Sequence, residues 1–238
     1  MQRAVHLLYP SQCLSCGGLV DSDFGLCGTC WRDTPFIAGL VCDKCGVPLI
    51  GEDTGEAVLC DDCMTTARPW AQGRAALLYK DNGRRLVLAL KHGDRQDLAT
   101  PSGGWLARVA APMVRENTLI APVPLHWMRL LKRRYNQSAL LATELAHAVR
   151  RSCCVDLLQR TKRTRSLEGL GRDARFSMLA GSIQVHPRRT HRLAGRPVLL
   201  VDDVMTSGAT LAAATEACLT AGASEVCVVT LARVAKDA

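Results

Sequence analysis

Residues Val198–Thr210 read VLLVDDVMTSGAT, and this stretch decides the fold. Its first four residues are apolar, which is typical of a strand that is buried on both faces. A loop of small residues follows the two aspartates, and an alanine-rich helix is expected from Ser207 to Gly222. The stretch therefore predicts a strand, a loop and a helix in succession, with Asp202 and Asp203 where the strand meets the loop.

Strands and helices alternate from Arg74 to the end of the chain. Strands are expected at 74–80, 117–125, 153–158, 182–185, 196–201 and 224–234, and helices at 83–93, 136–150 and 207–222. A further helix is expected within 96–114, after an interruption at Pro101, Gly103 and Gly104. This alternation predicts an α/β fold, with a mainly parallel sheet and helices on both faces. Ligands bind outside the carboxyl ends of the strands in such folds, where the loop after Val201 falls.

Eight of the twelve cysteines form four Cys-x-x-Cys units near the N-terminus: Cys13, Cys16, Cys27, Cys30, Cys42, Cys45, Cys60 and Cys63. Two such units place four thiolates around one zinc ion, and Gly17 and Gly46 suit the positive φ of the turns. The alternatives are disulfides, which are rare in cytoplasmic proteins, and redox motifs, which rarely come four in a row. We therefore predict two structural Zn²⁺ sites, with the units paired in chain order as the simpler arrangement and in an interleaved way as the alternative.

The composition limits the class of protein. The chain has 238 residues, of which 48% are hydrophobic and 4% aromatic, so aliphatic residues and alanine must form most of the core. This length suggests one large domain and a small module, which is the cysteine-rich segment. No stretch is apolar enough to span a bilayer, and the first residues do not resemble a secretory signal. We therefore expect a soluble, cytoplasmic protein without a membrane span.

The positive charge is concentrated in one segment. The formal net charge is +8, but residues 129–196 contain 16 Lys and Arg residues and four acidic residues. This segment therefore carries an excess of 12 positive charges, and the rest of the chain is negative. Such a distribution points to a polyanionic ligand at that segment.

The residues around the aspartate pair suit a sugar phosphate. Small residues let backbone N–H groups approach an anion, and the helix that follows adds further donors and a favourable dipole. The two carboxylates would repel a phosphate, but they accept hydrogen bonds from neutral hydroxyls. The alternative is that the two acids only cap a turn before the helix. We expect a ligand site, because a cap needs one carboxylate and its position belongs nearer Thr206 or Ser207.

The stretch Val198–Thr210 resembles the phosphoribosyl-pyrophosphate (PRPP) binding signature of type I phosphoribosyltransferases. Together with the four Cys-x-x-Cys units and the stretches ALLYK, LKHG, PVPL, YNQSA and VVTLAR, it makes nearly the whole chain similar to the ComF competence-protein family. The resemblance implies a double zinc ribbon at 1–66 and a type I phosphoribosyltransferase-like domain at 73–238.

The resemblance also implies roles for individual residues. The ribose hydroxyls of PRPP would bind Asp202 and Asp203. The 5′-phosphate would bind a loop formed by Thr206, Ser207, Gly208, Ala209 and Thr210. The stretch near the pyrophosphate would be Pro122, Val123, Pro124 and Leu125, and the cations of a closing loop would be Arg163 and Arg165. Mg²⁺ would accompany PRPP.

Three positions depart from the family pattern. Arg134 stands where the family has Gly, Leu167 where it has Gln, and Met178 where it has Asn. Leu167 and Met178 fall in the stretch expected to cover the site, whereas the PRPP signature is intact.

Two functions follow from the sequence. The first is a phosphoribosyltransferase that moves the phosphoribosyl group from PRPP to an unidentified acceptor. The alternative is a protein that binds single-stranded DNA, or competence and recombination proteins, in DNA uptake or recombination. PRPP would then be a ligand or regulator at most. The positive segment 129–196 and the zinc units motivate this alternative.

Overall fold

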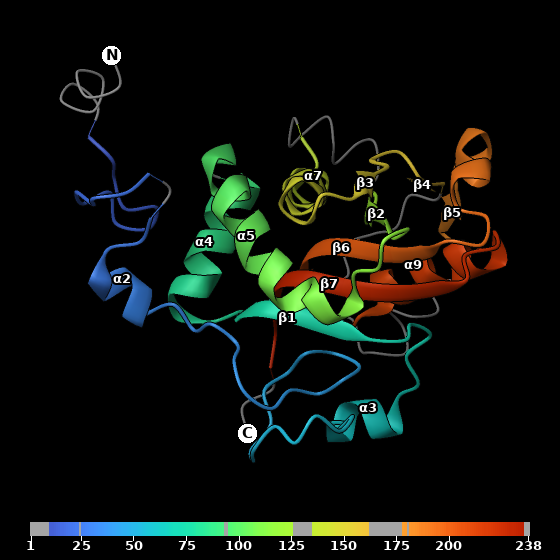
Figure 1. Cartoon of the computed structure of the whole chain (residues 1–238), viewed down its shortest axis with the longest axis horizontal. Coiled ribbons are helices and arrows are strands. Elements are labelled where there is room, and N and C mark those ends of the chain that lie inside the picture. The colour runs from blue at the N-terminus through green and yellow to red at the C-terminus, as the bar shows by residue number, and fades with distance from the viewer. Residues whose placement is uncertain are drawn as a thin grey trace.

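The computed structural model describes residues 10–23, 25–92, 95–125, 135–161, 178–179 and 181–235. A central sheet runs through the molecule in the strand order β1-β7-β6-β2-β3, and all of its pairs are parallel. Its strands are β1 (Gly73–Leu78), β2 (Leu119–Pro122), β3 (Ser152–Cys153), β6 (Pro197–Met205) and β7 (Glu225–Arg233). The predicted α/β class with a parallel sheet is confirmed (Figure 1).

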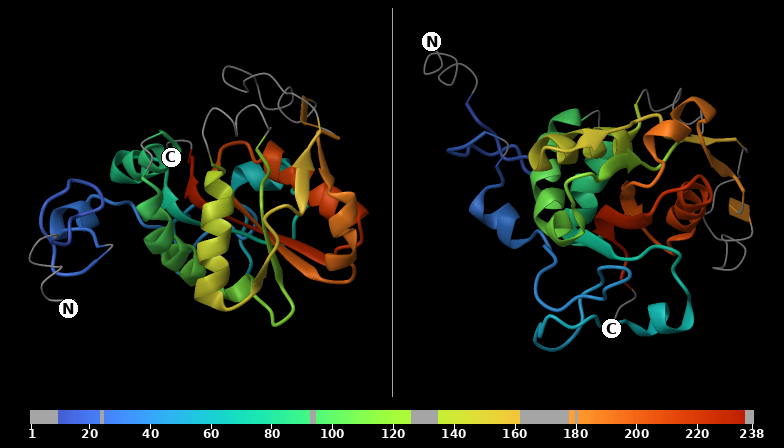
Figure 2. Two further views of the ribbon diagram at one scale, coloured as in Figure 1. Left: turned by 90° about the horizontal axis from the view of Figure 1, so that it is seen from above. Right: turned by 45° about the vertical axis from the view of Figure 1, so that its right-hand side comes forward.

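Helices cover both faces of this sheet. One face carries α4 (Asp81–His92), α5 (Ala99–Ala110) and α7 (Gln137–Val149), and the other carries α9 (Ala209–Thr220), as Figures 1 and 2 show. The short helices η1 (Gln96–Leu98) and η2 (Ala111–Met113) flank α5. Alternate residues of β6 enter the two cores, Leu199 and Val201 on the α4–α7 face and Val198 and Leu200 on the α9 face. Because β6 is buried on both faces, its sequence is a continuous apolar run.

The expected strand at 153–158 is wrong in one respect. A turn at residues 155–157 divides it into β3 and a separate strand β4 (Leu158–Arg160). This second strand pairs antiparallel with β5 (Ile183–Val185) outside the main sheet. Asp156 lies in the turn and forms an ion pair with Arg189 of the short helix η3 (Pro187–Arg192), at 2.7 Å. Backbone hydrogen bonds from Leu157 to the carbonyl of Cys154 and from His186 to the carbonyl of Leu157 accompany the turn.

The predicted interruption within the helical region 96–114 is also wrong, because α5 begins at Ala99 and runs through Pro101. Proline is tolerated in the first turn, where backbone N–H groups have no partner within the helix. Gly103 is required for contact with α7, since an added Cβ would lie 2.5 Å from the Cβ of Glu144. The two glycines therefore do not end the helix, and one of them lets two helices meet closely.

Replacement of Gly103 by valine is expected to lower the free energy of unfolding by about 3 kcal/mol, because α5 and α7 must move apart. Gly104→Val is the matched control, since an added Cβ at Gly104 meets nothing within 4 Å. Urea unfolding of both variants measures the difference. Equal stability of Gly103→Val and the wild type would contradict the close packing described here.

The cysteine-rich segment lies in two parts of the molecule. The first part carries the short helix α2 (Gly28–Arg32) and lies beside α4, whereas the second carries α3 (Asp61–Thr65) and lies beneath β1 (Figure 1). The stretch that follows α3 is not an exposed linker. Within it, Trp70 is 1% exposed and belongs to the same core cluster as α9. The second part is therefore packed into the core of the α/β fold.

Candidate functional site

The aspartate pair lies within strand β6 and not in the loop that follows it. The strand continues to Met205 because its partner β7 continues beside it, with Asp202 opposite Thr230 and Met205 opposite Arg233. Both aspartates therefore stand near the end of a central strand, at the carboxyl edge of the sheet. This is the edge where the sequence predicts a ligand site.

Asp202 is held by hydrogen bonds from two elements. Ser138, in the first turn of α7, donates its hydroxyl to Oδ1 of Asp202 at 2.8 Å, and the N–H of Asp203 donates to the same oxygen at 2.9 Å. Burial and the neighbouring charge of Asp203 raise the pKa of Asp202 to about 7, although Ser138 and the charge of Lys91 oppose the rise. A carboxyl group with this pKa changes its charge near neutral pH, which is common at functional sites.

Asp203 forms an ion pair with Lys91 near the end of α4, at 3.1 Å between Nζ and Oδ2. The N-terminus of α7 fixes the surrounding elements. Asn136 caps α7 through Ser138 and donates to the carbonyl of Val123, and the hydroxyl of Tyr135 donates to the carbonyl of Leu90 at 2.7 Å. The stretches LKHG, PVPL and YNQSA, which are far apart in sequence, therefore meet around the aspartate pair.

The loop after β6 has the form of an anion cup. Gly208 is the N-cap of α9, with a φ of +80°, so the cap is glycine and not the expected Thr206 or Ser207. Within the described part of the chain, the N–H groups of Gly208, Thr210 and Leu211 have no hydrogen-bond acceptor. Unpartnered donors at the start of a twelve-residue helix attract an anion.

The structure describes some of the other predicted site residues and not others. Pro122, Val123 and Pro124 are buried beside β6, where the N–H of Val123 donates to the carbonyl of Val201, and Leu125 is half-buried. Arg163 and Arg165 lie outside the described residues. Ser138 and Lys91 contact the aspartates but are absent from the predicted site residues, although the stretches that contain them are part of the family resemblance.

The cysteines form two separate clusters in chain order. The first contains Cys13, Cys16, Cys27 and Cys30, the second contains Cys42, Cys45, Cys60 and Cys63, and the ligand atoms of each lie within 4.8 Å of one another. Zinc–sulfur bonds of about 2.3 Å place tetrahedral sulfurs about 3.8 Å apart. The observed distances are 3.8 Å between Cys16 and Cys27, and 3.7 Å between Cys45 and Cys60. Both clusters therefore fit structural zinc, and pairing in chain order is confirmed.

The two clusters differ in their surroundings. Cys42 and Cys45 are 0% exposed, whereas Cys16 is exposed. A hydrogen bond from Cys45 lowers the pKa of the Cys42 thiol to about 4. The same hydrogen bond, together with burial, raises the pKa of the Cys45 thiol. The positive charge of Arg233 opposes this rise. The second cluster thus lies near a buried cation of strand β7.

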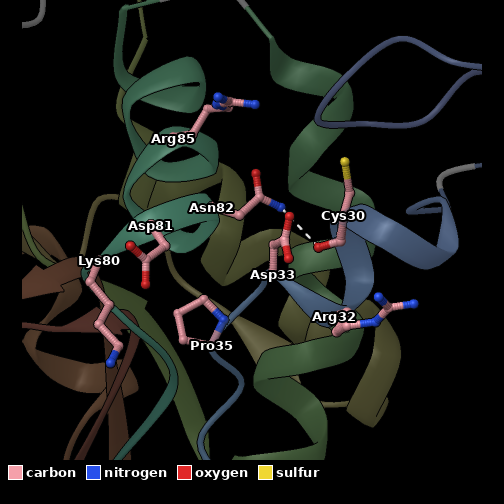
Figure 3. A pocket seen from close by; sticks show the side chains of 8 residues that line it. All are labelled: Cys30, Arg32, Asp33, Pro35, Lys80, Asp81, Asn82 and Arg85. Carbon is pink, nitrogen blue, oxygen red and sulfur yellow. Dashed lines mark hydrogen bonds between the residues drawn. The ribbon is translucent and has the colours of Figure 1, made fainter.

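A pocket lies between the first cluster and α4, with a volume of about 640 Å³ (Figure 3). Its lining residues include Arg32, Lys80 and Arg85, together with Asp33 and Asp81. The lining thus carries three cations and two carboxylates, beside a cluster whose thiolates would add negative charge. Asn82, which donates to the carbonyl of Cys30 at 3.2 Å, ties this cluster to α4.

Part of the positive segment lies at the opposite edge of the sheet. Arg151 precedes β3 and donates to the carbonyl of Arg115, and Arg196 precedes β6 and donates to the carbonyl of Asn117. The strands are parallel, so their amino ends share one edge, away from the aspartate pair. These cations are therefore separate from the anion cup.

The fold and the two cysteine clusters agree with known protein families. Residues 4–64 match the family model described as a double zinc ribbon domain, and residues 135–238 match that of a phosphoribosyl transferase domain. The chain is thus a double zinc ribbon joined to a phosphoribosyltransferase-type domain. Within the described residues, no helix has both the length and the apolar character needed to cross a membrane.

Relatives place the chain more narrowly. It is 28% identical over 233 residues to the DNA utilization protein YhgH of Escherichia coli, covering 95% of this chain and 99% of that protein. It is 32% identical over 114 residues to Competence protein F of Haemophilus influenzae, covering 48% and 49% of the two chains. The chain is thus similar over nearly its whole length to a DNA utilization protein, and over about half of its length to a competence protein.

A solved structure of glutamine PRPP amidotransferase from B. subtilis, complexed with ADP and GMP, is also similar. It matches with a TM-score of 0.41 and 17% identity, covering 60% of this chain and 30% of that one.

Proposed function

We propose that the protein binds PRPP at the carboxyl edge of the sheet and transfers its phosphoribosyl group to an unidentified acceptor. The observation that carries this proposal is the cup at Gly208, with its unpartnered N–H groups, next to the carboxylates of Asp202 and Asp203. Anion donors and hydroxyl acceptors in one place match a sugar phosphate. In this proposal the double zinc ribbon spans residues 1–66, the phosphoribosyltransferase-like domain spans residues 73–238, and the protein is cytoplasmic.

In this proposal each part of the site has a role. Backbone N–H groups of Thr206–Thr210 hold the 5′-phosphate, and Asp202 and Asp203 accept hydrogen bonds from the ribose hydroxyls. The stretch Pro122–Leu125 lies by the pyrophosphate, and Arg163 and Arg165 approach it from the covering loop. Carboxylates are oxygen ligands of the kind that Mg²⁺ prefers, and Mg²⁺ bound with PRPP offsets the charge of the leaving pyrophosphate.

The reaction would be a displacement at the anomeric carbon of PRPP. The bond to the acceptor forms as the bond to pyrophosphate breaks, through a transition state with oxocarbenium character. Carboxylates that hold the ribose hydroxyls keep the sugar oriented while the charge develops. The chemistry needs a site that orients PRPP, and the contacts of Ser138 and Lys91 hold the two carboxylates in place for it.

Calorimetric titration with PRPP and Mg²⁺ tests the proposal. We expect saturable binding of one PRPP per chain, weaker binding of ribose 5-phosphate, and exchange of labelled pyrophosphate into PRPP when a suitable base is present. Absence of PRPP binding, together with no product from a panel of bases, would overturn it. Binding of PRPP without turnover would support PRPP as a ligand and overturn the proposed transferase activity.

A second candidate is nucleic-acid binding, which is favoured by the names of the relatives and by cations such as Arg151 and Arg196 at the amino edge of the sheet. Single-stranded DNA bound there would leave the PRPP site free. A salt titration would then give a steep decrease of affinity, with a slope of about −0.7 per phosphate contact. Saturating PRPP should not change this binding, and absence of DNA binding at low salt rejects the candidate.

A further inference from the structure

Two buried arginines lie against the loop that forms the anion cup. Arg68 is 8% exposed and Arg233 is 4% exposed. Nη1 of Arg68 donates to the carbonyl of Ser207. Nη1 of Arg233 donates to the carbonyls of Met205, at 3.2 Å, and Thr206, at 2.9 Å. Two cations from other parts of the chain therefore bind the carbonyls of three consecutive residues, from the end of β6 into the loop.

Neither cation pairs with a carboxylate in the described part of the chain. No described carboxylate forms an ion pair with Arg68 or Arg233, and Nε and Nη2 of Arg68 and Nε of Arg233 have no hydrogen-bond partner. The Arg68 guanidinium lies over the ring of Trp70, 5.6 Å from its centroid. The thiolates of the second cluster lie near Arg233, whereas Arg68 has no counter-ion among the described residues. A buried charge without a counter-ion is costly, so Arg68 favours an anion nearby.

Arg68 reaches the loop from the stretch that directly follows the second zinc ribbon. It follows α3, which carries Cys63, and precedes Trp70. Trp70 and Lys44, which lies between Cys42 and Cys45, exchange hydrogen bonds. The indole Nε1 donates to the carbonyl of Lys44 at 2.6 Å, and Lys44 Nζ donates to the carbonyl of Trp70 at 3.0 Å. The cysteines of the second cluster therefore fix the residue on which Arg68 stacks.

Glycine at position 208 fits this arrangement. A Cβ added there would lie 2.9 Å from Nη1 of Arg68 and 3.0 Å from the Trp70 ring, so the side chains from the ribbon pack directly against the cup. The first ribbon has no such contact among the described residues, since its cluster is tied to Asn82 on α4. The two ribbons therefore differ in their relation to the loop.

We propose that the second zinc ribbon is part of the anion site, with Arg68 as the positioning residue of the 5′-phosphate loop. This inference rests on the proposed function. By binding the carbonyl of Ser207, Arg68 turns the peptide so that its N–H side faces the cup, and its charge makes the cup more attractive to a phosphate. Zinc bound by the second cysteine cluster therefore supports phosphate binding through Arg68, whereas zinc bound by the first cluster does not.

The test compares Arg68→Met with Arg68→Lys, using calorimetric titration with PRPP and Mg²⁺, ribose 5-phosphate, and pyrophosphate. Arg68→Met should weaken the binding of PRPP and of ribose 5-phosphate by the same factor, roughly tenfold, because one charged hydrogen-bond donor is lost. Pyrophosphate affinity should not change, and Arg68→Lys should restore most of the loss. Arg74→Met is the matched control, because Arg74 pairs with Asp43 on the same ribbon without contacting the loop.

A second comparison uses the zinc ligands. Cys60→Ser should lower the affinity for ribose 5-phosphate, and Cys27→Ser should leave it unchanged. If Cys60→Ser does not fold, the Arg68 variants decide. Suppose that the wild type binds PRPP and that an Asp202 variant does not. Unchanged affinity of Arg68→Met for PRPP would then overturn the role of Arg68 and leave the proposed function standing. A wild-type protein that binds neither PRPP nor ribose 5-phosphate would overturn both this inference and the proposed function.

Discussion

Replacement of Asp202 by asparagine should weaken PRPP binding about a hundredfold and, at the same time, stabilise the free protein above neutral pH. The loss of affinity follows because a buried carboxylate that accepts hydrogen bonds from ribose hydroxyls is removed, and hydrogen bonds to charged groups are the stronger ones. The gain in stability follows from the raised pKa of Asp202, which burial and the charge of Asp203 cause.

The sign of the pH effect is fixed by linkage. In the unfolded chain Asp202 ionises near its ordinary pKa of 3.8, and in the folded protein its pKa is about 7. Between these values the folded state binds more protons, so the wild type loses stability as pH rises from about 4 to about 7. An asparagine side chain does not titrate, so the Asp202→Asn variant lacks this loss and should be more stable by about 1–3 kcal/mol at pH 8.

Denaturant unfolding of both proteins at pH 5 and pH 8 measures this difference, and titration with PRPP at pH 8 measures the affinity. Ser138→Ala is the control, because it removes the hydrogen bond to Asp202 and keeps the carboxyl group. A variant that is less stable than the wild type at pH 8, or that binds PRPP with full affinity, would contradict the role given to Asp202.

Loss of the second zinc site should destabilise the protein far more than loss of the first. Cys45→Ser and Cys16→Ser form a matched pair, since each replaces the last cysteine of a unit that a glycine with positive φ follows. Cys45 is 0% exposed within the core that contains Trp70 and Met205, whereas Cys16 is exposed. We expect a cost of about 3–5 kcal/mol for Cys45→Ser, because a core shared by two parts of the chain loses its metal support.

Thermal unfolding and zinc content check this second prediction. Each variant should retain one zinc ion per chain, but the melting temperature should fall strongly in Cys45→Ser only. For Cys16→Ser we expect local loss of hydrogen-exchange protection around residues 10–30, with the sheet still protected. Equal destabilisation by the two substitutions would show that both ribbons are integrated into the core to the same extent.

The sequence was sufficient to predict the class of fold and the zinc clusters, because both depend on local signals. The apolar run of β6 and the alternation of elements from Arg74 define a parallel sheet, and the spacing of the cysteines defines two metal sites. The helix expected at 136–150 is confirmed as α7, and its first expected residue, Asn136, is the N-cap.

The parts of the site that depend on long-range contacts were not predictable in the same way. Arg68 lies in a stretch that reads as a linker, and no local pattern indicates that it reaches Ser207, which is 139 residues away. Strand β6 extends past the aspartates because β7 continues beside it, and this pairing is not encoded in the residues of β6 themselves. Strand β4 likewise pairs with β5, which lies more than 20 residues further along the chain, and not with the main sheet.

A crystal structure of the protein with PRPP and Mg²⁺ is the most direct test of the proposed site. The 5′-phosphate should lie within about 3 Å of backbone N–H groups in the loop Thr206–Thr210, with the ribose hydroxyls bound to Asp202 and Asp203. PRPP bound at another place, or bound with its pyrophosphate in the cup at Gly208, would contradict the account.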